Sequence, residues 1–175
     1  MTQLQHADTM LSDDVVTHLD AQLASARGLL QVILEQGTAI RNRDVPAVVA
    51  LTGVIQAELQ RRGSIEQERA RLLERAGARL GIDASAVTLS LLCELMDPET
   101  AAQAQASSAE LRGLLEVVRR EHHVNRVLMN QELAFLDHLL RLAGNGDTAY
   151  DSGGDRSTVR PVGASAIHRV LDLEV

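Results

Sequence analysis

Aromatic side chains are almost absent from this sequence. Phe135 and Tyr150 are the only two, tryptophan does not occur, and hydrophobic residues still make up 45% of the 175 residues. A core without rings must be built from leucine, valine, isoleucine and alanine, which suits a helix bundle better than a sheet. A chain of this length is expected to form one domain. We therefore expect an all-α fold.

Lysine and paired cysteine are also missing. All 17 basic residues are arginine, and the formal net charge of −7 repels nucleic acid, with no basic stripe to offset it. The single Cys93 cannot form an internal disulfide, which suits a reducing compartment and excludes a cysteine-rich zinc site. The N-terminus has no signal-peptide pattern, and no run approaches the roughly 20 apolar residues of a membrane span. We expect a cytoplasmic protein that binds no nucleic acid.

Apolar residues recur at helical spacing over most of the chain. Asp44, Asp83 and Asp97 are the expected N-caps, and Gly81 is expected to end the second helix. The predicted fold is an elongated antiparallel helical hairpin or three-helix bundle within residues 1–143, with coiled-coil-like packing. Its helices are expected at about 9–41, 45–80, 84–96 and 98–143.

The composition changes after Ala143. Residues 144–175 are rich in glycine, serine and aspartate, which is typical of a flexible tail. The end of that tail, residues 167–175, is apolar again and partly alternating, so it predicts either a strand or a helix that docks on another surface.

Two of the expected helices carry a narrow apolar seam with alternating spacings of three and four residues, as in a heptad repeat. In the second helix, residues 60–71 are so polar that we do not expect them to be buried all round. The first seam consists of Val16, Leu19, Leu23, Ala26, Leu30, Ile33, Gly37 and Ile40. The last seam consists of Ala104, Ser108, Leu111, Leu115, Val118, His122, Asn125, Met129, Glu132, Leu136 and Leu139.

The stretch REHHVNRVLMNQ, residues 120–131, places His122 and Asn125 on the last seam. A metal site needs convergent ligands, but the sequence has neither Glu-x-x-His nor His-Glu-x-x-His. Two consecutive helical histidines also point about 100° apart. One polar residue in a seam fixes helix register at some cost in stability. We interpret Asn125, reinforced by His122, as a register determinant, and we expect no metal and no cofactor.

Catalysis has one candidate location, a cluster of arginines on the second helix. Glutamates interleave with these arginines, several at i,i+4 spacing, which predicts a solvated, ion-paired helix face. The sequence also offers no nucleophile elbow and no glycine-rich phosphate loop. We therefore expect that the chain is not an enzyme. The cluster consists of Arg61, Arg62, Arg69, Arg71 and Arg75.

The order of several short motifs resembles the FlgN family of flagellar export chaperones. The resemblance covers residues 11–154 and rests on LEQGTAIRNRD (34–44), QERARLL (67–73) before Leu-Gly, NRVLMN (125–130) followed by LAFLDHLL (133–140), and TAYDSGG (148–154). It implies a cytoplasmic protein without catalytic residues or cofactor. Such chaperones bind hook-associated proteins of the hook–filament junction, prevent their premature assembly, and deliver them to the export gate and ATPase components at the membrane.

The resemblance also implies where a client binds, namely the apolar end of the last helix and the segment after it. A long helix with more apolar surface than its own core needs can cover the sticky terminal helix of a client. Phe135 either contacts such a partner or packs in the core, and both alternatives remain open. Tyr150, with an apolar ring and a polar tip, is expected to dock onto a client or an export component. The expected partner-binding residues are Leu133, Phe135, Leu136, Leu139, Leu140 and Tyr150.

A second interpretation needs no client. The same seams would suit a structural coiled-coil or adaptor protein that associates with itself. This alternative predicts a stable oligomer that forms at low micromolar concentration without a client, whereas the chaperone interpretation leaves a homodimer open.

Overall fold

In the computed structural model, residues 2–147 are described, and they contain helices and no strand. This confirms the all-α prediction. The chain divides into two compact units, Met1–Ala134 and Phe135–Val175. The elements are the α-helices α1 (Thr2–Arg41), α2 (Val45–Leu80), α3 (Leu89–Cys93) and α4 (Pro98–Asp147), and the short 3-10 helix η1 (Ala84–Ala86).

Side-chain caps set the helix boundaries that the sequence indicated. The Asp44 carboxylate accepts a hydrogen bond from the Ala47 backbone amide at 3.1 Å, which caps the start of α2. Gly81 ends α2 in the left-handed conformation, with φ 69°. Asp97 accepts hydrogen bonds from the amides of Glu99 and Thr100, both at 3.0 Å, at the start of α4. The second helix therefore runs over 45–80, as expected.

The predicted helix over 84–96 is two short elements instead. Asp83 caps η1, and Val87 and Thr88 then adopt extended backbone before α3 begins. Thr88 caps α3 with its hydroxyl, which accepts a hydrogen bond from the Leu91 amide at 3.3 Å. The break follows from these two β-branched residues, because they favour extended backbone and Thr is a good cap. Helix α1 also begins earlier than expected, and α4 continues to Asp147, so residues 144–147 are helical and not part of a tail.

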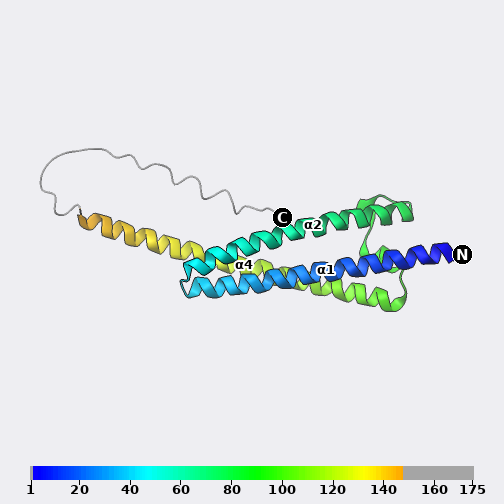
Figure 1. Cartoon of the computed structure of the whole chain (residues 1–175), viewed down its shortest axis with the longest axis horizontal. Helices are drawn as coiled ribbons and strands as arrows, with labels where there is room; N and C mark the ends of the chain where they lie inside the picture. Colours follow the sequence, from blue (N-terminus) through cyan, green and yellow to red (C-terminus); the bar gives the residue numbers. More distant parts are fainter. Residues whose placement is uncertain (1, 148–175) are drawn as a thin grey trace. The chain divides into compact units, whose positions relative to one another are not determined.

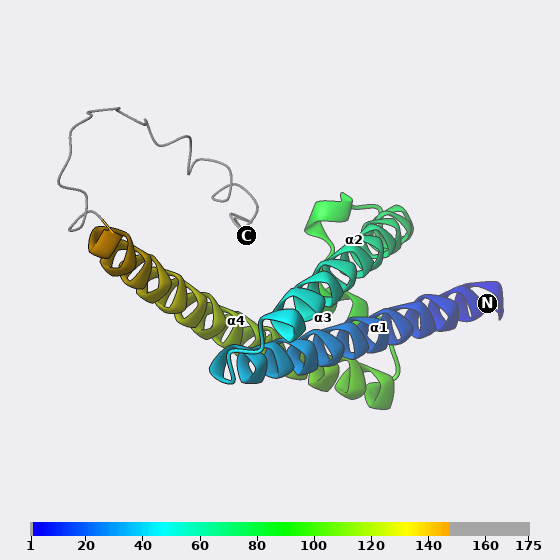
Figure 2. The ribbon, with the colours of Figure 1, turned by 60° about the vertical axis from the view of Figure 1, so that its left-hand side comes forward.

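Helices α1 and α2 form an antiparallel hairpin, and the first part of α4 packs beside them (Figures 1 and 2). The turn between α1 and α2 contains Arg43 with a positive φ of 56°. Two ion pairs show that α4 runs parallel to α1. Arg27 of α1 pairs with Glu110 near the start of α4, and Arg43, just after the end of α1, pairs with Glu132 further along α4. The prediction of a hairpin or three-helix bundle is confirmed for the unit Met1–Ala134.

Buried apolar side chains form two separate clusters. The first lies where the start of α1, the end of α2, the α2–α4 connection and the start of α4 meet, and the second lies further along α1 and α2. Residues 56–71 of α2 include no buried side chain, in agreement with the polar pattern of 60–71. The first cluster consists of Leu11, Val15, Leu19, Leu72, Ala76, Val87, Leu92 and Ala104, and the second of Leu29, Ile33 and Ile55.

The predicted seam of α1 is only partly correct. Val15 and Leu29 are buried in place of their neighbours Val16 and Leu30, which are half-buried. Helix α1 contacts both α2 and α4, so it buries a wider face than a two-helix seam, and a straight helix drifts relative to a strict heptad. The seam of α4 is buried or half-buried as far as Glu132, whereas Leu136 and Leu139 are exposed.

Candidate partner-binding surface

Asn125 is a buried polar residue in the contact between α1 and α4. Its side chain is 3% exposed, and its Nδ2 donates to the Ile33 backbone carbonyl at 2.7 Å and to Gln36 Oε1 at 3.3 Å. A buried amide with these partners is satisfied only when α4 lies in one position along α1. The geometry therefore suits the register role that the sequence suggested.

The polar contact extends from α4 through α1 to α2. Gln36 Nε2 donates to the hydroxyl of Thr52 at 3.0 Å, and that hydroxyl donates to the Val48 carbonyl at 2.8 Å. Gly37 makes room for the contact, since a Cβ at this position would lie 2.6 Å from Asn125 Oδ1. We call Gln36, Thr52 and Asn125 the polar tie, because it links all three long helices.

His122 lies one turn before Asn125 and is half-buried. Burial lowers its pKa below the ordinary histidine value, and the charges of Arg126 and His123 lower the pKa further. Within the described part of the chain, its side chain makes no hydrogen bond. Its proposed reinforcement of the register stays a prediction.

The end of α4 is exposed along its whole described length. Every side chain of 133–143 is exposed, including Leu136 at 52% and Leu140 at 71%. By helical spacing, Leu136, Leu139 and Leu140 share one face, while Phe135 lies beside it. The exposed apolar residues here are Leu133, Phe135, Leu136, Leu139, Leu140 and Leu142.

Leu142 is the residue of this group that the sequence interpretation omitted. It lies seven positions after Phe135, which places both on the same side of the helix. An i,i+7 search from the aromatic residue would have found it. We call Phe135, Leu136, Leu139, Leu140 and Leu142 the apolar face of α4.

Soluble proteins rarely leave large apolar side chains clustered and uncovered. The apolar face has polar neighbours on the same helix, among them Asp137, which pairs with Arg141. An apolar stripe beside ion-paired residues is the pattern with which amphipathic helices bind one another. The chemistry of this surface is therefore that of a helix-binding face.

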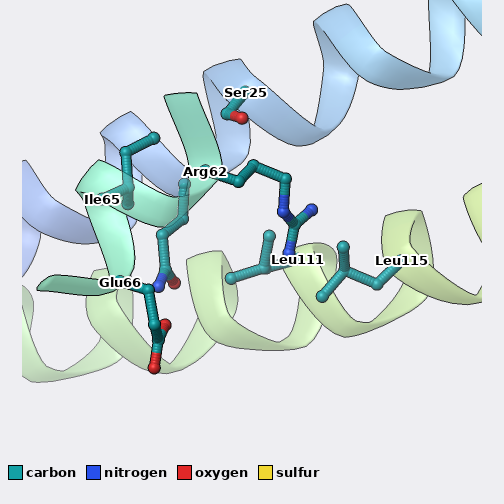
Figure 3. Close-up of a pocket in the computed structure, with 7 residues that line it drawn as sticks. Ser25, Arg62, Ile65, Glu66, Leu111 and Leu115 are labelled. Carbon is teal, nitrogen blue, oxygen red and sulfur yellow. The ribbon is translucent and has the colours of Figure 1, made fainter. Parts of the chain in front are cut away.

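The arginine cluster of α2 does not converge on one site. Arg69 donates to Glu66 at 2.7 Å, which lowers the pKa of that carboxyl, and Arg75 pairs with Asp14 of α1 at 2.8 Å. A pocket of about 170 Å³ in the middle of the bundle contains Arg62 together with Glu66 (Figure 3). Arg69 and Arg75 are thus each ion-paired on the surface with a different acidic residue.

The described residues hold no group of three histidine, cysteine, aspartate or glutamate side chains that could bind a metal ion. Among the helices of residues 2–147, none combines the length and the apolar character that a membrane crossing requires. Tyr150 and the apolar segment 167–175 lie outside the described residues.

A protein-family model matches most of the chain. The FlgN protein model matches residues 10–158, which include the hairpin, the polar tie and the whole apolar face. No curated protein and no solved structure matches the chain significantly.

Proposed function

The chain belongs to the FlgN family of flagellar export chaperones, and from this premise we propose that its client is a hook-associated protein of the hook–filament junction. The client's terminal helical segment binds the apolar face of α4 in the cytoplasm. Binding keeps the client unassembled until the chaperone delivers it to the export gate and ATPase components at the membrane.

The observation that carries this proposal is the exposed apolar face of α4. A junction protein assembles through apolar helical segments, so its unassembled form needs a cover of the same chemistry. Full burial of a leucine or phenylalanine side chain is worth about 1.5–3 kcal/mol. Five half-exposed residues can therefore supply a sizeable part of the ~8 kcal/mol that micromolar affinity requires.

The polar tie gives this surface a defined position on α4. Asn125 fixes which residues of α4 pack against α1, and Glu132 is the last one before the exposed stretch. A shift of α4 along α1 would leave the amide of Asn125 without its partners, at a cost of about 1–3 kcal/mol. The register role of Asn125 thus selects the residues that remain available to a client.

Isothermal titration calorimetry with the terminal segment of a hook-associated protein from the same organism tests the proposal. We expect micromolar or tighter binding to the wild type. The variant Leu136→Asp with Leu139→Asp should bind at least tenfold more weakly while circular dichroism shows unchanged helicity.

A matched control separates the apolar contact from the added charge. Asn130→Asp with Ala134→Asp also places two aspartates on exposed positions of this stretch of α4, but on the side of the helix opposite the apolar face. This control should keep the wild-type affinity within about threefold. Equal loss in both variants, or no binding by the wild type, would reject the proposed site.

Tyr150 supplies a second, separate contact in this proposal. An aromatic ring in a glycine-rich segment is suited to an interface with either the client or an export component. Tyr150→Ala in the same titration distinguishes the two partners. Reduced client affinity assigns the ring to the client, and unchanged client affinity with reduced binding to export components assigns it to delivery.

A structural role through self-association is the alternative that the same apolar face supports. Five exposed apolar residues on one helix would also pair with a second copy of the chain. Light scattering after size-exclusion chromatography distinguishes the chaperone role from the structural role. A stable oligomer at low micromolar concentration that excludes the client segment would favour the structural role over the chaperone.

A further inference from the structure

In the middle of the three-helix bundle, α1 buries apolar side chains such as Leu23 and Ala26, but α2 buries none. The two apolar clusters lie on either side of a layer in which α2 contributes no buried side chain between residues 56 and 71. In place of leucines, α2 presents Glu58, Arg62 and Glu66 at successive i,i+4 positions, so that one helix face is charged. The two halves of the hairpin are therefore stabilised separately.

A pocket of about 170 Å³ lies in this polar layer (Figure 3). Ser25 of α1, Arg62 of α2, and Leu111 and Leu115 of α4 contribute to its wall, so all three long helices meet there. In Figure 3 the Arg62 side chain extends across the pocket toward the two leucines of α4, while the Glu66 carboxylate lies on the other side. The pocket thus joins polar and apolar groups.

Three buried polar atoms in and around this layer have no hydrogen-bond partner among the described residues. The Ser25 hydroxyl is in the pocket wall, and Ser25 is only 1% exposed. Glu58 Oε2 is on α2, one helical turn before Arg62, and His18 Nε2 is on α1, seven residues before Ser25. Leaving a buried polar group unsatisfied costs free energy, so native proteins provide a partner, commonly water.

The pocket is large enough for that partner. One water needs roughly 10–15 Å³ of such space and two to four polar neighbours. The pocket offers the Ser25 hydroxyl, the Gln22 amide and the Arg62 guanidinium as neighbours. Several waters therefore fit, and each finds hydrogen-bonding groups.

We propose that the layer around Ser25, Glu58 and Arg62 is a hydrated joint. Ordered water fills the pocket, and the middle of α2 opens locally while the apolar clusters on both sides stay packed. The ion pairs on this stretch, such as Glu66–Arg69, are exposed and contribute little to holding it closed. Regions with few buried apolar contacts open at a small fraction of the global unfolding free energy.

Opening of the joint has a defined structural consequence. It separates Ile65 of α2 from the two leucines of α4 that line the same pocket, so apolar surface becomes accessible inside the bundle. This surface is distinct from the apolar face of α4. The inference is independent of the proposed function and stands or fails without a client.

Hydrogen exchange of the full-length protein, followed by mass spectrometry, tests the opening. Amides of 57–69 should exchange at least tenfold faster than those of 73–79, which belong to the same helix but adjoin the first apolar cluster. Uniform protection along α2 would overturn the proposal. This comparison needs no variant.

Replacing two polar side chains of the layer with leucine provides a second test, with a matched control. Glu58→Leu with Arg62→Leu should slow exchange of 57–69 about tenfold, because it replaces the polar wall with apolar side chains. Arg61→Leu with Glu68→Leu changes the same residue types at exposed positions and should leave exchange unchanged. Equal slowing in both variants would contradict the joint.

Ser25→Ala tests the water itself. If water satisfies the hydroxyl, its removal should lower the urea midpoint slightly or leave it unchanged. If no water hydrogen-bonds the hydroxyl, the substitution removes an unsatisfied buried polar group and should clearly raise the urea midpoint. A raised midpoint would overturn the hydrated pocket.

Discussion

Replacing Gly37 with alanine should destabilise the bundle, although the same change elsewhere on α1 should stabilise it. Glycine in a helix interior costs roughly 0.5–1 kcal/mol relative to alanine, so the substitution normally gains that amount. At Gly37 the new methyl group would lie 2.6 Å from Asn125 Oδ1 and 3.4 Å from its Cγ. Side-chain atoms do not approach so closely, so the amide must move.

The cost of that movement follows from the hydrogen bonds that hold the amide. Asn125 donates to the Ile33 carbonyl at 2.7 Å and to Gln36 at 3.3 Å, and both bonds weaken when the side chain shifts. A typical bond contributes about 1 kcal/mol, and a buried polar group left unsatisfied costs about 1–3 kcal/mol. Subtracting the helix-propensity gain leaves a net destabilisation of about 1–2 kcal/mol for Gly37→Ala.

The control is Gly28→Ala on the same helix. A Cβ at Gly28 would meet no atom within 4 Å, so only the propensity gain of roughly 0.5–1 kcal/mol remains. Urea denaturation followed by circular dichroism measures both free energies of unfolding. The two variants should differ by about 1.5–3 kcal/mol, with opposite signs relative to the wild type.

A double variant identifies the physical cause. In the Asn125→Ala background the clash is absent, so Gly37→Ala should become neutral or stabilising. A coupling free energy of about 1 kcal/mol or more between the two positions is expected for residues in contact. Stabilisation of the wild type by Gly37→Ala to the same extent as by Gly28→Ala would refute the predicted clash with Asn125.

Two further predictions concern stability. Gly77→Ala should destabilise the folded protein more than Gly37→Ala does. The new Cβ would lie 2.8 Å from the Ile82 carbonyl oxygen and 3.1 Å from the Ala84 amide nitrogen, and backbone atoms cannot rotate away as a side chain can. A urea midpoint equal to that of the wild type would contradict this prediction. Acid should also destabilise the fold. Burial lowers the pKa of His18 and of His122 in the folded state, opposed at His18 by Glu66 and Glu68 and assisted by Arg69. The unfolded chain therefore binds protons first, and stability is lost as pH falls below the ordinary value of 6.5 toward the lowered pKa of each group. The urea midpoint should be lower at pH 5.5 than at pH 7.5, and His18→Gln with His122→Gln should reduce that difference. An unchanged difference in this variant would contradict the prediction.

Sequence periodicity was sufficient to predict the long helices and the buried stripe of α4. The caps Asp44 and Asp97 and the terminator Gly81 act locally, so their roles are visible in the chain itself. The last seam also predicted the burial of α4 down to Asn125 and Glu132, because α4 uses one continuous stripe.

Other features depend on contacts that the sequence does not display. Gly37 was predicted to lie on the seam of α1. Its role in making room for Asn125 depends on the close approach of α1 and α4, and these two residues are 88 positions apart in the sequence. The break between η1 and α3 depends on Val87, whose burial in the first apolar cluster accompanies extended backbone there. A hydrophobic period alone could not distinguish such an arrangement from one short helix.

The apolar face of α4 looks different in the sequence and in the structure. Leucine spacing continues past Glu132 without any change, so periodicity alone predicted that Leu136 and Leu139 would be seam residues like those before them. In the structure these two leucines are exposed, so the same spacing that predicts packing instead leaves an apolar surface uncovered. Leu142 was missed because the i,i+7 spacing from Phe135 was not followed.

The central claim is that this chain holds a junction protein in its unassembled form. The most direct measurement follows the self-assembly of a full-length hook-associated protein by light scattering, with and without an equimolar amount of the chain. We predict that the wild type suppresses assembly at a defined stoichiometry and that Leu136→Asp with Leu139→Asp does not. Assembly that proceeds unchanged in the presence of well-folded wild-type protein would contradict the account.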